Sequence, residues 1–101
     1  MNPYSLHSPE KAADTLAKRV RELRLERGWR QKTLAERSGV TLASLRRFET
    51  SGRISLQNLL RLAFALHRLD EFLDLLEPPP ARSLDELEKR AQRPRRERGT
   101  I

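Results

Sequence analysis

Two adjacent arginines, Arg46 and Arg47, are the residues of this chain whose type and spacing best suit chemical recognition. Placing successive residues 100° apart about a helix axis puts both on the side opposite the apolar residues of the same segment. A guanidinium can donate two hydrogen bonds to the edge of guanine, and a small apolar side chain can contact the methyl group of thymine. The face formed by Ala43, the two arginines and Thr50 therefore predicts an interface with the major groove of DNA.

Catalytic and metal-binding chemistry has no comparable pattern. The chain has no cysteine, and its two histidines, His7 and His67, lie far apart in sequence without companion ligands. No Gly-rich phosphate loop and no nucleophile with a neighbouring base is recognisable, and the acidic residues within 70–77 suit the solvated face of a helix. We therefore predict no enzyme, no catalytic residues, no metal site and no cofactor.

Two short helices, predicted over residues 31–50, must position the arginines. Gly39 can adopt the left-handed conformation that ends a helix, and Ala35 allows two helices to cross closely. Thr41 follows as an N-cap whose hydroxyl can accept from the backbone N–H of Ser44. The spacing indicates a helix, a tight turn and a second helix that presents its free face to DNA.

This segment resembles the helix-turn-helix of the Cro and lambda-repressor family, also called XRE-like regulators. The resemblance rests on Gln31, Ala35, Gly39, Val40, Leu45, Phe48 and Glu49. It extends over residues 12–77 and implies an all-α fold, a five-helix lambda-repressor-like DNA-binding bundle. It also implies a structural pair between Arg24 and Glu49, which as a surface ion pair would contribute about 0–1 kcal/mol. Arg30 departs from the family, which commonly has Thr, Ser or Asn as a helix cap there.

Eight residues are predicted to contact DNA: Gln31, Lys32, Thr41, Leu42, Ala43, Arg46, Arg47 and Arg53. The two arginines of the second helix are the candidates for reading bases, and which of them bonds guanine stays open. Leu42 and Ala43 are expected to contact thymine methyl groups, while Gln31 and Thr41 are expected to position the helix.

The remaining two DNA contacts are predicted on the phosphate backbone. Cations are disfavoured at a helix N-terminus, so a phosphate beside Lys32 would relieve that conflict. The competing interpretation of this position is a solvated basic turn. Arg53 lies in the loop after the second helix, where the resemblance implies a course beside the DNA backbone.

Flanking helices complete the predicted bundle. Ser8 caps a first helix that begins at Pro9 and ends at Gly28. Ser55 caps a fourth helix that runs through Leu66. The inward residues predicted for this fourth helix are Leu56, Leu59, Leu60, Ala63 and Phe64.

A fifth helix is predicted over residues 69–77. Its apolar stripe comprises Leu69, Phe72, Leu73 and Leu76, and Leu75 lies off that stripe. This is more apolar surface than one small bundle needs, which favours either a dimer seam or an enlarged core.

Three prolines, at residues 78–80, cannot continue a helix and divide the chain. We expect a DNA-binding domain over residues 8–77 and, over residues 78–101, a Pro-rich linker, a short helix and a basic tail. Ser83 and Glu86 fit a capping box at the start of that helix. The tail contains Arg93, Arg95, Arg96 and Arg98, a composition typical of a segment without a fold of its own.

The formal net charge of +7 agrees with a polyanionic partner. We predict a transcriptional repressor that binds double-stranded DNA as a homodimer, on a palindromic operator with half-sites about 34 Å apart. The chain also resembles HipB-type antitoxins, which implies an autoregulated toxin-antitoxin operon and a HipA-like toxin kinase as partner. The alternatives are a protein whose main role is to neutralise that toxin, and a stand-alone repressor with no toxin partner.

The sequence also predicts a cytoplasmic protein without a membrane anchor. No apolar run approaches the roughly 18 residues needed to cross a membrane, and residues 1–10 lack the basic and apolar blocks of a signal peptide. The absence of cysteine agrees with a reducing compartment. No effector domain and no ligand pocket is predicted.

Overall fold

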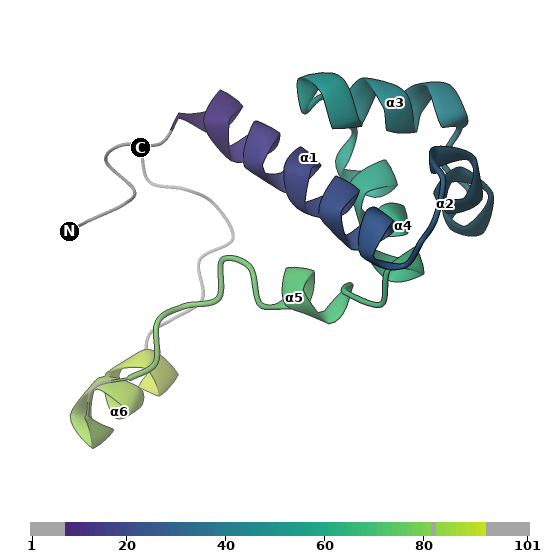
Figure 1. Ribbon diagram of the computed structural model, residues 1–101. Helices are drawn as coiled ribbons and strands as arrows, with labels where there is room; N and C mark the ends of the chain where they lie inside the picture. Colours follow the sequence, from purple (N-terminus) through teal and green to yellow (C-terminus); the bar gives the residue numbers. More distant parts are fainter. Residues whose placement is uncertain (1–7, 82, 93–101) are drawn as a thin grey trace.

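The computed structural model describes residues 8–81 and 83–92, which form helices and no strands (Figure 1). The helices are α1 (Pro9–Glu26), α2 (Gln31–Ser38), α3 (Leu42–Ser51), α4 (Leu56–Ala65), α5 (Asp70–Leu73) and α6 (Leu84–Gln92). The predicted all-α class is therefore confirmed, and the predicted short C-terminal helix is present. None of the helices in the described residues is long and apolar enough to span a membrane.

Hydroxyl caps begin α1, α3 and α4 where the sequence predicts them. The Oγ of Ser8 accepts from the backbone N–H of Lys11 at 3.1 Å, and Pro9 stands at the first helical position. The Oγ1 of Thr41 accepts from the N–H of Ser44 at 3.1 Å, and Ser55 caps α4 in the same way. Each cap satisfies a backbone donor that a helix N-terminus leaves unpaired.

Two glycines in the left-handed conformation end α2 and α3. Gly39 has φ 77° and Gly52 has φ 76°. The two sites differ in their surroundings, because a Cβ built on Gly39 meets nothing within 4 Å. A Cβ on Gly52 would lie 3.1 Å from the backbone carbon of Ala13 and 3.0 Å from a carboxylate oxygen of Asp14. Gly52 therefore also allows the end of α3 to approach α1 closely.

This contrast predicts unequal effects of alanine at the two glycines. Gly39→Ala should cost about 1–2 kcal/mol through left-handed backbone strain alone. Gly52→Ala should cost that amount plus about 1–3 kcal/mol, because the α1 backbone must shift. Urea denaturation of both variants measures the difference, and equal losses of stability would contradict the close packing of α3 against α1.

The core lies between the first four helices and holds the helix pair α2–α3 in place. Its largest fully buried side chains are Leu34, Leu45, Phe48, Leu62 and Leu66. Helix α1 packs against α3, while α2 packs against both α3 and α4. The second helix of the pair is thus fixed from behind by α1 and from its start by α2, which leaves its other side open (Figure 1).

Helix α4 turns a different face inward from the one predicted. Leu59 and Ala63 are buried as expected, but Leu56 and Phe64 are 67% and 69% exposed, and Leu60 is half-buried. The buried row continues instead through Leu62 and Leu66. Apolar residues cover more than half of the circumference of this helix, so their spacing alone cannot select which row is buried.

The predicted fifth helix over residues 69–77 is wrong in its length. Helix α5 covers only Asp70–Leu73, and turns follow it. Leu76 adopts the left-handed region at φ 63°, and Glu77 precedes a proline, which disfavours helical backbone. Of the predicted stripe, Phe72 packs against the core and Leu69 is half-buried, whereas Leu73 and Leu76 are exposed.

Helix α6 lies apart from the bundle (Figure 1). The N–H of Glu86 donates to the Oγ of Ser83 at 3.2 Å, which confirms Ser83 as the cap. Leu84 and Leu87 remain 76% and 51% exposed, so this helix buries little apolar surface. The predicted basic tail, with Arg93, Arg95, Arg96 and Arg98, lies outside the described residues.

Candidate nucleic-acid interface

The outer face of α3 contains the side chains that the helical spacing predicts. Ala43, Arg46, Arg47 and Thr50 are exposed, while Leu45 and Phe48 are buried on the opposite side. The Thr50 hydroxyl donates to the backbone carbonyl of Arg46 at 2.7 Å, so it is bound to its own helix. The two arginines are therefore the side chains of this face best able to reach a ligand.

A buried ion pair holds α3 against α1. The Nε and Nη2 of Arg24 each donate to a carboxylate oxygen of Glu49 at 2.9 Å, and Nη1 donates to the carbonyl of Trp29 at 2.9 Å. The side chains of Arg24 and Glu49 are only 8% and 3% exposed. The resemblance implied this pair. The expectation that it contributes to stability like a surface ion pair is wrong, because the bundle encloses both side chains.

Gln31 extends this network to the outer face. Its Nε2 donates to Glu49 at 3.1 Å, and its Oε1 accepts from the Nε of Arg46 at 3.4 Å, a long and weak bond. The half-buried Gln31 therefore connects the buried ion pair to an exposed arginine. Because only the Nε of Arg46 is used, both terminal nitrogens of its guanidinium stay available for a planar acceptor pair.

Arg47 and Arg53 line a cleft of about 210 Å³ beside α3, called the polar cleft because all of its wall residues except Ile54 are polar. Within the described residues, neither guanidinium has a hydrogen bond or an ion pair. Ser44, Ser55 and Asn58 contribute the polar atoms of the wall, and the capped N-terminus of α4 borders the cleft. Two unpaired cations beside a helix N-terminus favour an anionic group such as a phosphate.

This cleft joins residues that sequence reasoning did not connect. Arg53 was predicted alone, as a loop residue, and the three polar wall residues were not predicted to contact DNA. The sequence indicates this position indirectly, because Arg53 lies shortly before Ser55, the N-cap of α4, and its charge is therefore close to the start of that helix.

The N-terminus of α2 also has no negatively charged side chain in its first turn. Arg30 occupies the N-cap position without a side-chain cap, and the first turn contains no acidic residue. Lys32 is exposed there, which keeps it accessible to a phosphate. Trp29 at this corner is half-buried, with the guanidinium carbons of Arg27 and Arg37 at 5.3 and 4.5 Å from its ring centroid. It therefore packs at the junction of α1 and α2.

Thr41 and Leu42 lie at the start of α3, where Thr41 is exposed and Leu42 is half-buried. The Thr41 hydroxyl caps α3 and also donates to the Oγ of Ser44 at 2.8 Å. Leu42 is half-buried and packs against the core. Both residues therefore serve the placement of α3, and only part of the Leu42 side chain can face a ligand.

Comparison with known protein families connects this geometry to a function. The helix-turn-helix family matches residues 20–72, a range that contains α2, α3, α4 and most of α5. Neither the comparison with curated proteins nor the comparison with solved structures gave a match. The family match confirms the XRE-like resemblance and the lambda-repressor-like class of the bundle. The chain belongs to the helix-turn-helix family, and it is an XRE-like DNA-binding regulator of transcription.

Proposed function

We propose that the protein is a sequence-specific repressor that binds a palindromic operator as a homodimer, with one α3 in each of two major grooves. The observation that supports this proposal most is the pair Arg46 and Arg47. Both side chains are exposed on a helix whose other side is buried, and Gln31 orients the Nε of Arg46. A rigid helix with planar donors on its free face suits the reading of base edges.

The two arginines receive different roles in this proposal. Arg46 reads guanine, because Gln31 orients its Nε and leaves the terminal nitrogens to form a bidentate pair with O6 and N7. Ala43 lies one turn earlier on the same face and contacts a thymine methyl group. Gln31 thus positions Arg46 from within the protein, in addition to any contact of its own with DNA.

Phosphate groups occupy the two basic positions that flank the reading face. Arg47 and Arg53 hold one phosphate in the polar cleft, and Lys32 holds another at the uncapped start of α2. Such contacts set the register of the protein on the duplex and carry no base information directly.

The homodimer is proposed on an apolar groove of about 740 Å³ along α4 and α5. On the α4 side, Leu56, Leu60 and Phe64 follow one row at intervals of four residues, and the polar Gln57 and Arg61 lie beside them. Its α5 side includes Leu73 and the fully exposed Leu76. Soluble monomers seldom expose apolar patches of this kind, and a symmetric partner would cover the groove with the same residues.

Phe64→Asp is expected to yield a folded monomer with weak affinity for the operator, because Phe64 is 69% exposed and supports the groove more than the core. Analytical ultracentrifugation measures the state of association. The matched control is Leu25→Asp, since Leu25 is 49% exposed on α1 and does not line the groove. If the wild type sediments as a monomer at high concentration, this seam is not a dimer interface.

Selection of bound sequences from a random pool of duplexes tests the proposed function. The expected result is a palindrome whose half-sites are centred about 34 Å, or about 10 base pairs, apart. Enrichment of no sequence, or of one asymmetric site only, would overturn the proposal of a dimeric repressor.

A second proposed role is that of an autoregulating antitoxin that binds a HipA-like kinase. The observation in its favour is α6, a short helix apart from the bundle whose Leu84 and Leu87 are exposed to any partner. A segment that adds little to the stability of its own domain is free to order on another protein. A stand-alone repressor with no toxin partner is the alternative.

Deletion of residues 81–101 separates these roles. The melting temperature of the bundle should change little, because α6 buries few apolar atoms. Calorimetry measures that temperature, and titrations measure binding to the operator and to a HipA-like kinase. Loss of kinase binding alone supports the antitoxin role, whereas uniform loss of DNA affinity places the segment on the phosphate backbone. Unfolding of the shortened chain would contradict the domain boundary at the prolines.

A further inference from the structure

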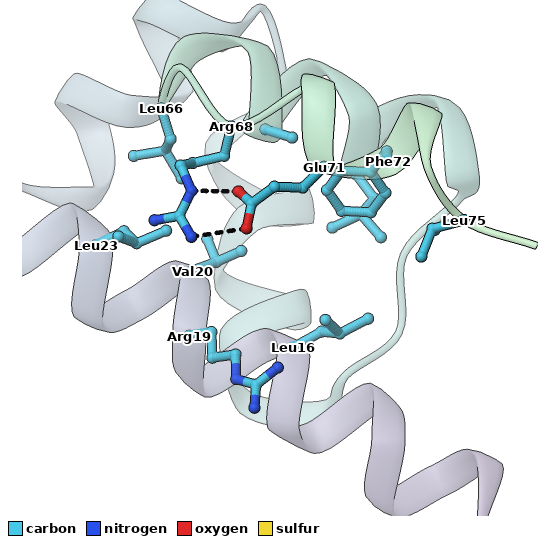
Figure 2. Close-up of a pocket in the computed structure, with 11 residues that line it drawn as sticks. Leu16, Arg19, Val20, Leu23, Leu66, Arg68, Glu71, Phe72 and Leu75 are labelled. Atoms are coloured by element: carbon cyan, nitrogen blue, oxygen red, sulfur yellow. Dashed lines mark hydrogen bonds and ion pairs between the residues drawn. The ribbon is translucent and has the colours of Figure 1, made fainter. Parts of the chain in front are cut away.

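A second pocket, of about 380 Å³, opens between α1, α4 and α5 (Figure 2). Apolar side chains form most of its wall. They include Leu16, Val20 and Leu23 of α1, Phe72 of α5, and Leu75, which follows α5. The volume lies within the range of small-molecule sites, and the apolar wall offers water few hydrogen-bond partners. The pocket is therefore better suited to an apolar group than to solvent.

Three charged side chains stand at this pocket, and two of them neutralise each other. Arg68 donates two hydrogen bonds to the carboxylate of Glu71, as the dashed lines in Figure 2 mark. The hydrogen bond from Arg68 lowers the pKa of Glu71, so this carboxylate remains ionised and its charge remains matched.

Arg19 is the third charged side chain. It extends from α1 at the pocket and is exposed (Figure 2). Within the described residues its guanidinium has no hydrogen bond and no ion pair. The pocket thus combines an apolar wall with one uncompensated positive charge.

We propose that this pocket binds a small amphipathic anion, with its hydrocarbon or aryl body against the apolar wall and a single carboxylate at Arg19. A single negative charge on the ligand is the complement, because Arg68 and Glu71 neutralise each other and the charge of Arg19 alone is unmatched. The sequence predicted no ligand pocket, since its wall comes from helices far apart in the chain. The inference concerns binding alone and does not depend on the proposed function.

The test uses octanoate as the anionic probe and octan-1-ol as the neutral probe of equal length, both below the concentrations at which they aggregate. Two-dimensional amide NMR spectra of the isotope-labelled full chain are recorded without DNA. Octanoate should give saturable shifts at the amides of Val20, Leu23 and Phe72. Its Kd should be roughly tenfold lower than that of octan-1-ol, because a charge-assisted hydrogen bond to Arg19 adds to the apolar contacts.

Two variants of the same helix sharpen the test. Arg19→Gln should raise the Kd of octanoate to that of octan-1-ol, whereas Arg21→Gln, an equal charge change outside the pocket, should leave it unchanged. Equal affinities for the two probes, or no effect of Arg19→Gln, would overturn the proposal. Octanoate shifts confined to the α4–α5 groove would also overturn it. So would amide shifts at this pocket that appear without any probe and grow with protein concentration, because they indicate that a second copy of the chain binds there. A failure of this test leaves the DNA-binding proposal untouched.

Discussion

Replacing Arg24 by methionine is expected to destabilise the bundle by about 3–5 kcal/mol. The substitution removes three hydrogen bonds and leaves the carboxylate of Glu49 almost fully buried, with only the amide of Gln31 as a donor. A buried charge without its partner has lost its hydration, and one amide donor offsets that cost only in part. Urea denaturation followed by circular dichroism measures the loss.

Two further variants test that explanation. Replacing both Arg24 and Glu49 by methionine should recover much of the stability, since no charge is then left unpaired. Arg68→Met breaks a pair whose side chains are 47% and 57% exposed, so solvent replaces the lost partner and the loss should be much smaller. If Arg24→Met is no more harmful than Arg68→Met, the buried pair does not hold α3 against α1.

Replacing Arg46 by alanine is expected to weaken operator binding by about 1–3 kcal/mol per half-site and to relax the preference at one base pair. The reason is the loss of a bidentate bond to guanine from a side chain that Gln31 orients. Titrations of the variant against the operator and against single-base substitutions of it measure both effects.

Arg47→Ala should behave differently, because Arg47 shares the polar cleft with Arg53. It should weaken binding to all duplexes alike and reduce the slope of affinity against salt by about one per subunit. Lys32→Ala is the matched phosphate-contact variant and should show the same pattern. If Arg47→Ala alters base preference and Arg46→Ala does not, the two assignments are reversed.

The parts of the fold that depend on neighbouring residues could be predicted from the sequence. Ser8, Thr41 and Ser55 cap helices through bonds to backbone three residues on, and Gly39 ends a helix by its own conformation. The outward direction of the arginines follows from helical spacing once Leu45 and Phe48 are buried.

Features that depend on packing could not be predicted in the same way. Leu56 and Phe64 were expected inside, because the apolar side of α4 is broad and only its neighbours decide which row is buried. The length of α5 depends on the turn at Leu76 as well as on the prolines that follow.

The candidate site likewise has features that could be predicted from the sequence and features that depend on packing. Arg46 and Arg47 were predicted as an exposed pair, but nothing in their spacing distinguishes one from the other. The difference comes from Gln31, on another helix, and from Arg53, in a loop. The burial of the pair between Arg24 and Glu49 likewise arises only when α1, α2 and α3 meet.

The most direct test of sequence-specific binding is an equilibrium titration of the selected operator and a base-shuffled duplex of equal composition, each at two salt concentrations. Both affinities should fall steeply with salt, since several Lys and Arg side chains displace counterions from phosphates. The operator should bind tighter than the shuffled duplex by about a thousandfold or more at both concentrations. Equal affinity for the two duplexes at each salt concentration would contradict the assignment of α3 as a reader of DNA sequence.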